Sequence, residues 1–235
     1  MPHKYLETEL VAVDWQGNVQ KFLADPDAKV RIAKANLRLA IWAKQFEKVD
    51  HGNPALCFIR EMQVAGHHVA AASALSLYKC AASSVRNIVE TALYYTYFRS
   101  HFKELETLVR DTKFYISKDD VIEYHKKHTP NFPKYQEKLC LVGTLNQWYS
   151  SISAVVHGQI PGAWIEHKSI SEISHRPATL NFVVAALEQG EEIVHQLFLC
   201  TTGREYWDVF STTSKQKLIH GLSGDIKTVL GLDAA

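Results

Sequence analysis

The residues best suited to chemistry in this chain lie at the end of one amphipathic segment, Tyr149 to Gly158, which reads Tyr-Ser-Ser-Ile-Ser-Ala-Val-Val-His-Gly. At 100° per residue, its polar side chains form a narrow stripe beside an apolar arc. The stripe comprises Asn146, Ser150, Ser153 and His157, and the arc comprises Leu145, Trp148, Ile152, Val155 and Val156. Gly158, Pro161 and Gly162 end the helix, so His157 is expected in its last turn, beside the negative end of the helix dipole. That position favours a protonated imidazole and acid–base chemistry near neutral pH.

A second polar group is expected on an earlier helix. Arg86 and Glu90 are spaced i, i+4, so they can form an ion pair, and Tyr97 lies farther along the same flank. If this helix packs against the helix over 134–158, Arg86 and Glu90 converge with Ser153 and His157. A guanidinium, a carboxylate and an imidazole together could bind a phosphodiester and move protons for it. The alternative is a structural polar network between two packed helices.

The elements that must position these groups are helical along most of the chain. Helical periodicity predicts helices over about 26–49, 54–78, 79–100, 117–128, 134–158 and 177–201. Asp25 is expected to cap the first, with Pro26 at its first position, and Ser117 to begin a later one. Residues 160–176 are expected to be a loop, and residues 1–25 are ambiguous. Within them, Leu10–Trp15 is compatible with a short strand followed by a turn at residues 17–18.

These patterns predict an all-α fold, a helical bundle with short peripheral helices. Residues 1–235 are expected to form a single domain, with an N-terminal extension over 1–25 and short helices over 204–235. At 46% hydrophobic residues the chain can build a substantial core. Its formal net charge of +1 argues against a general nucleic-acid coat protein.

The cysteines and the apolar runs bear on location. The four cysteines are widely spaced, and we expect them to be buried free thiols in a reducing cytoplasm. The first residues contain no apolar signal-like segment, and no run approaches the roughly 18 apolar residues of a membrane span. A soluble cytoplasmic protein with no membrane partner is therefore expected. Glycine-rich phosphate loops, Gly-x-Ser-x-Gly elbows and His-Glu-x-x-His motifs are absent from the sequence.

The two polar stretches together resemble the HEPN superfamily, over roughly residues 55–200. The resemblance rests on an Arg-x-x-x-Glu helix followed by aromatics, residues 86–97, and on a later helix ending Ser-x-x-Val-His-Gly, residues 153–158. It implies an α-helical bundle, usually a homodimer, that binds RNA. It also implies a ribonuclease without metal or other cofactor, acting in toxin–antitoxin or antiviral defence systems, with a protein partner encoded in the same operon.

The chain departs from the HEPN signature in one respect. That signature has an arginine five to seven positions before the histidine, and His157 supplies the histidine, but positions 150, 151 and 153 are all serine. We hypothesise that Arg86 substitutes and carries the phosphate charge. Glu90 would then orient Arg86 or His157, and Ser153 would hydrogen-bond a phosphate oxygen or the ribose. The residues expected to contact substrate are Tyr149, Ser150, Asn146 and Tyr97.

Two other functions remain open. The first is a non-catalytic helical binding or interaction module, in which the same polar cluster fixes helix packing or recognises a partner. The second is a ferritin-like di-iron protein, because Glu172-Ile-Ser-His175 and Glu192-Ile-Val-His195 both read Glu-x-x-His. Pro177 counts against this second alternative, since it places the first motif in a loop.

A local basic surface is the last candidate feature. Arg31, Lys34 and Arg38 recur along one helix, and Lys126 and Lys127 lie near several aromatic residues. Those aromatics are Tyr124, Phe132 and Tyr135. Cations can neutralise phosphates and aromatic rings can stack on unpaired bases. The alternative is the ordinary solvated face of amphipathic helices.

Overall fold

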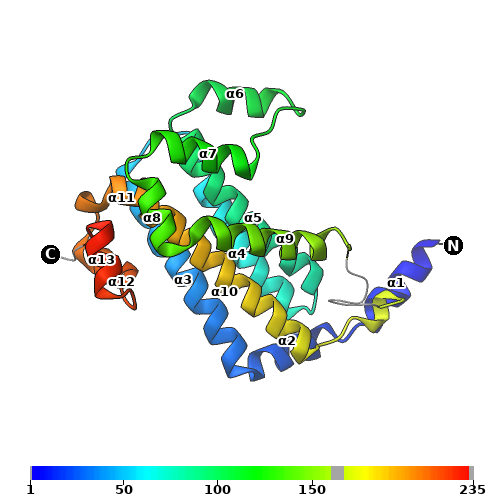
Figure 1. Ribbon diagram of the computed structural model, residues 1–235. Helices are drawn as coiled ribbons and strands as arrows, with labels where there is room; N and C mark the ends of the chain where they lie inside the picture. The colour runs from blue at the N-terminus through cyan, green and yellow to red at the C-terminus, as the bar shows by residue number, and fades with distance from the viewer. Residues whose placement is uncertain (1, 160–166, 233–235) are drawn as a thin grey trace.

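The computed structural model describes residues 2–159 and 167–232, and every regular element in them is helical. The prediction of an all-α bundle with short peripheral helices is therefore confirmed (Figure 1). In chain order the α-helices are α1 (Pro2–Ala12), α2 (Trp15–Ala24), α3 (Pro26–Val49), α4 (Leu56–Ala74), α5 (Tyr78–Phe98), α6 (Phe102–Arg110), α7 (Lys118–His128), α8 (Phe132–Leu139), α9 (Leu141–Val156), α10 (Pro177–Cys200), α11 (Thr202–Glu205), α12 (Thr212–Leu218) and α13 (Gly224–Leu230). Two short 3₁₀ helices are η1 (Ile170–Glu172) and η2 (Trp207–Val209).

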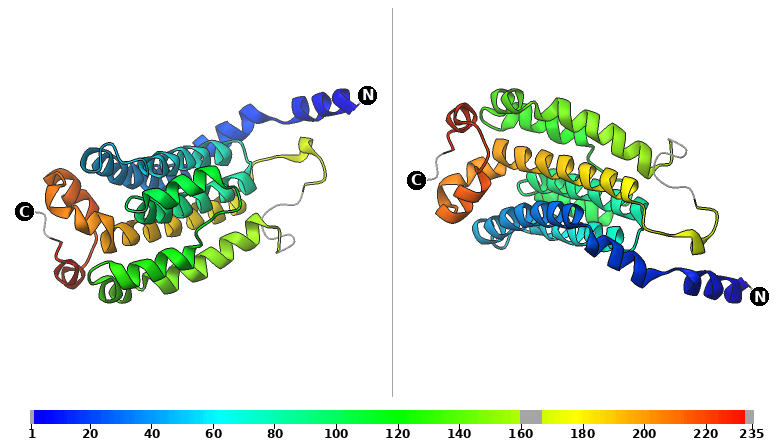
Figure 2. Two further views of the ribbon diagram at one scale, coloured as in Figure 1. Left: turned by 90° about the horizontal axis from the view of Figure 1, so that it is seen from above. Right: turned by 90° about the horizontal axis from the view of Figure 1, so that it is seen from below.

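The core lies among the four long helices α3, α4, α5 and α10, which pack side by side. Trp42 and Phe46 of α3, Tyr95 of α5 and Phe198 of α10 are buried and meet ring to ring. Helix α9 packs across α5 and α10 through Leu145 and other apolar side chains (Figures 1 and 2). Helices α1 and α13 lie at opposite ends of the molecule (Figure 2). The bundle thus holds α5 and α9, the two helices with the candidate residues, against each other.

The helix starts follow from local side-chain chemistry. The Asp25 carboxylate accepts hydrogen bonds from the first backbone N–H groups of α3, and Pro26 occupies the first turn. Ser117 and Asp120 form a reciprocal capping box at the start of α7. Both predicted starts are confirmed. They could be predicted from the sequence because capping depends on neighbours within four residues.

The structure differs from the sequence-based expectations in three places. The ambiguous segment Leu10–Trp15, which is compatible with a short strand, is the end of α1 and the start of α2, and the Asp14 carboxylate caps α2 by accepting from the N–H of Gly17. Helix α6 was not among the predicted helices, although its apolar and polar residues fall on opposite faces at helical spacing and Leu105 is buried. The single helix over 134–158 is broken at Cys140, whose φ of 55° is left-handed. This break lets α8 pack on α13 while α9 packs on α5.

The cysteine prediction is partly wrong. All four are free thiols, but Cys57, Cys80 and Cys140 are exposed and Cys200 alone is buried. Each of the three exposed cysteines lies on the outward side of a helix or at a helix end. Local sequence does not determine which side of a helix faces solvent. None of the described helices combines the length and apolar composition needed to cross a bilayer.

Candidate functional site

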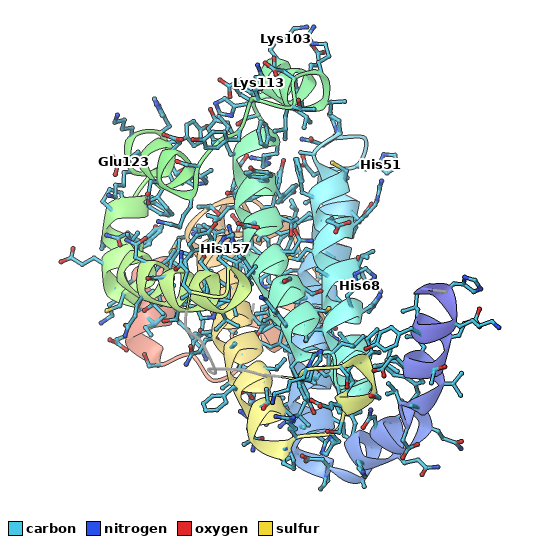
Figure 3. All side chains as sticks on the ribbon, turned by 90° about the vertical axis from the view of Figure 1, so that its right-hand side faces the viewer. His51, His68, Lys103, Lys113, Glu123 and His157 are labelled. Carbon is cyan, nitrogen blue, oxygen red and sulfur yellow. The ribbon has the colours of Figure 1, made fainter. Side chains whose placement is uncertain are left out.

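Arg86 is the centre of a polar cluster between α5 and α9. Its guanidinium donates to Glu90 Oε1 at 2.9 Å, to the Tyr149 hydroxyl at 2.8 Å and to His157 Nε2 at 2.8 Å. The Tyr149 hydroxyl in turn donates to Glu90 Oε1 at 2.6 Å. Arg86, Glu90 and Tyr149 are partly buried, whereas His157 is exposed at the end of α9 (Figure 3). Arg86, Glu90 and His157 thus converge as expected, while Tyr149 takes the place in the cluster that was expected for Ser153.

The contact with Arg86 determines which form of the His157 ring is present. A guanidinium has hydrogen-bond donors only, so His157 Nε2 must accept through a lone pair. The ring is then neutral and carries its proton on Nδ1. A neutral imidazole with an accessible Nε2 can act as a base.

The fold brings His157 to Arg86 through close helix packing. Trp148 of α9 lies against Gly190 of α10, where a Cβ would stand only 2.8 Å from the indole, and its N–H donates to the carbonyl of Ala186. Gly158 has a φ of 66° and ends α9, with its N–H bonded to the carbonyl of Val155. Trp148 therefore fixes the approach of α9 to the bundle, and Gly158 leaves His157 as the final residue facing α5.

Charge and burial determine the protonation states of Arg86 and Tyr149 at neutral pH. Burial lowers the pKa of Arg86, but the charge of Glu90 and the bond to Tyr149 outweigh it and leave the pKa raised. Burial, and then the hydrogen bond to Glu90, raise the pKa of Tyr149 to about 12. Arg86 is therefore charged and the Tyr149 hydroxyl protonated throughout the physiological range.

The remaining residues of the stripe occupy different environments. Ser153 lies one turn before His157, and its buried Oγ has no hydrogen-bond partner among the described residues. Asn146 accepts a hydrogen bond from Lys118 Nζ at 2.6 Å, and that ammonium lies 5.7 Å from the centre of the Tyr149 ring. Ser150 is exposed. Asn146 thus adjoins the cluster through Lys118, whereas Ser153 makes no hydrogen bond to it and Ser150 faces solvent.

Tyr97 is not part of the Arg86 cluster. Its ring stacks on His101 with centroids 4.1 Å apart and meets Tyr124 edge-on at 5.2 Å. Three turns of α5 separate it from Arg86, so it sits at the other end of the helix surface that the sequence pattern grouped together. Periodicity places residues on a face but ignores distance along the axis.

Several residues near the site were missed from the sequence. Lys118, Tyr94 and Tyr115 line a cavity of about 450 Å³ together with Arg86, Glu90 and Tyr149. They come from α5, from α7 and from the segment preceding α7, so no local spacing joins them. Lys79 was also missed, and its Nζ lies 3.6 Å from where a Cβ on Gly158 would stand. Its position seven residues before Arg86, two turns along the same face, was the available signal.

The expected basic surface on α3 is largely neutralised by α10. Arg31 pairs with Glu188, and Arg38 pairs with Glu191 and Glu192. The aromatic residues expected beside Lys126 do not form a stacking row either. Phe132 and Tyr135 are buried in the core, and Tyr124 packs on the Tyr97 and His101 rings.

The two Glu-x-x-His motifs lie in unlike places. His195 is buried in α10 and accepts a hydrogen bond from the Trp42 indole at 3.1 Å, whereas Glu172 is exposed in η1 and accepts one from the N–H of Lys168. Within residues 2–159 and 167–232, no three His, Cys, Asp or Glu side chains gather as a metal-binding group.

Comparison of the chain with models of protein families, with curated proteins and with solved structures found no match.

Proposed function

We propose that this chain is a HEPN-like, metal-independent ribonuclease. The observation that carries the proposal is the 2.8 Å contact between Arg86 Nη1 and His157 Nε2 at the solvent-exposed edge of the α5–α9 interface. A fixed cation beside a neutral imidazole is what cleavage of a phosphodiester by its own ribose hydroxyl requires. A role in toxin–antitoxin or antiviral defence belongs to the same proposal and rests on the resemblance alone.

The reaction would use the cluster as follows. A bound phosphate takes over the Arg86 N–H that His157 accepts in the free protein, which frees Nε2. That nitrogen removes the proton of the ribose 2′-hydroxyl, and the 2′-oxygen attacks phosphorus. The bond to the 5′-oxygen breaks and that oxygen takes a proton from water, giving a 2′,3′-cyclic phosphate and a free 5′-hydroxyl, and the resulting hydroxide takes the proton from His157 and restores the neutral ring. Arg86 stabilises the charge on the phosphoryl oxygens, and Glu90 with Tyr149 holds its guanidinium in place.

A non-catalytic binding module is the second candidate, and one observation favours it. The Arg86 guanidinium already has protein acceptors on Glu90, Tyr149 and His157, as in a structural network that joins two helices. In that function the cluster fixes the angle between α5 and α9, and His157 contributes packing rather than proton transfer.

RNA cleavage in EDTA separates the two functions. Purified wild type, His157→Ala and His68→Ala are incubated with total RNA in excess EDTA. His68 is a matched control because it is also exposed, on α4 (Figure 3). A ribonuclease predicts cleavage by wild type and His68→Ala, with ends that carry 2′,3′-cyclic phosphate. Loss of a general base predicts a rate lower by roughly 10²–10⁴-fold in His157→Ala. If wild type leaves RNA intact, or all three proteins cleave it equally, the catalytic proposal fails.

A further inference from the structure

The cavity beside Arg86 has an aromatic lining. It is lined by residues of α5, α7, α9 and the connection from α6 to α7, and its volume of about 450 Å³ is within the range of small-molecule sites. Tyr94, Tyr115 and Tyr149 are three of its lining residues, and the Tyr94 ring also packs edge-on against Phe58 and Phe98. Tyr115 is 72% exposed. An exposed aromatic side chain beside a hollow offers a free π-face to a flat ligand.

The same cavity has charged groups at the end nearest α9. Arg86 and Lys118 both line it, and Lys118 Nζ lies 5.7 Å from the centre of the Tyr149 ring. Two carboxylates, Glu90 and Asp119, also line the cavity, and they pair with Arg86 and Lys118 respectively. An aromatic slot next to these two cations matches a ligand with a flat heterocycle at one end and a phosphate at the other, and that phosphate competes with the two carboxylates for the cations.

We propose that this cavity binds one unpaired nucleotide, with its base against Tyr115 and Tyr94 and its phosphate between Arg86 and Lys118. The inference rests on the proposed function in placing that phosphate beside His157. Stacking on aromatic side chains is how unpaired bases are commonly held, and it is tolerant of base identity. A base within a duplex has both faces covered, so the cavity selects single-stranded or extruded nucleotides. The ligand is a nucleotide unit, either free or within a strand.

Calorimetric titration without turnover tests this site separately from cleavage. The ligands are adenosine monophosphate, ribose 5-phosphate and a 2′-O-methyl adenosine trinucleotide, whose blocked 2′-oxygens cannot attack phosphorus. The protein variants are wild type, Tyr115→Ala and Tyr5→Ala. Tyr5 is a matched control, because it is 64% exposed on α1, remote from the cavity (Figure 1). Both rings are mostly in solvent, so neither variant should unfold.

We expect wild type and Tyr5→Ala to bind the nucleotide ligand with equal affinity. Both proteins should bind ribose 5-phosphate at least fivefold more weakly than the nucleotide ligand. Tyr115→Ala should weaken nucleotide binding by at least about fivefold, the lower end for removal of a stacking ring. Binding of the monophosphate shows that a free nucleotide is a sufficient ligand. Binding of the trinucleotide without binding of the monophosphate shows that the ligand is a nucleotide within a strand. The proposal is overturned if no nucleotide ligand binds at millimolar concentration, if ribose 5-phosphate binds as tightly, or if Tyr115→Ala matches Tyr5→Ala. Cleavage lost only in His157→Ala would still support the ribonuclease in that case.

Discussion

Tyr149 is the side chain that joins the two halves of the cluster, and replacing it by phenylalanine removes only its hydroxyl. That hydroxyl accepts from Arg86 at 2.8 Å and donates to Glu90 at 2.6 Å. A hydrogen bond to a charged partner contributes roughly 1.5–3 kcal/mol when buried. The Glu90 side chain is 35% exposed, so water replaces part of what is lost. We therefore expect Tyr149→Phe to lower the free energy of unfolding by about 1–2 kcal/mol.

A double-mutant cycle isolates the contribution of the contact with Glu90. Urea unfolding is measured for wild type, Tyr149→Phe, Glu90→Ala and the double variant, with Tyr5→Phe as the exposed control expected to change nothing. Because the hydroxyl and the carboxylate share one hydrogen bond, the loss in the double variant should fall short of the sum by about 1 kcal/mol. Single losses that add to within about 0.3 kcal/mol would show that Tyr149 does not hold Glu90 and would refute this account of the cluster.

Two further predictions concern other buried polar groups. Ser153→Ala should leave the free energy of unfolding unchanged or raise it by about 0.5–1 kcal/mol, because its buried Oγ lacks a partner among the described residues. If the hydroxyl contacts substrate, RNA cleavage should fall about tenfold in the same variant, and a destabilised or fully active variant would contradict this. His125 is buried between two threonines, and burial lowers its pKa to about 3 from the usual 6.5. Below pH 6.5 the unfolded chain then binds a proton that the folded ring does not, so stability is lost as the pH falls towards 3. In urea unfolding, His125→Gln should reduce the slope of the free energy of unfolding against pH by about 1.4 kcal/mol per pH unit. Parallel profiles of that free energy against pH for wild type and variant would count against this account.

Much of the fold could be predicted because its signals are local. Asp25 with Pro26 and the Ser117–Asp120 box mark helix starts through contacts within four residues, and both are present. The break at Cys140 could not be predicted, since a left-handed cysteine is not locally favoured. It exists because α8 and α9 both pack on α10 while α8 also packs on α13 and α9 also packs on α5, so the two helices need different directions. Packing over long distances thus overrides local preference where the two disagree.

By itself, the sequence determined which residues share a helix face and where some of the helices begin or end. The i, i+4 spacing of Arg86 and Glu90 and the glycine after His157 follow from helix geometry alone. Only the tertiary structure decided that α9 crosses α5 at a position that brings His157 to Arg86 while Tyr97 lies elsewhere. It also decided that Arg38 faces acids of α10 and that Lys118 and Tyr115 form one cavity with Arg86. The physical reason is that periodicity fixes the rotation of a residue about its own helix, whereas the offset and crossing of two helices depend on side chains far apart in the chain.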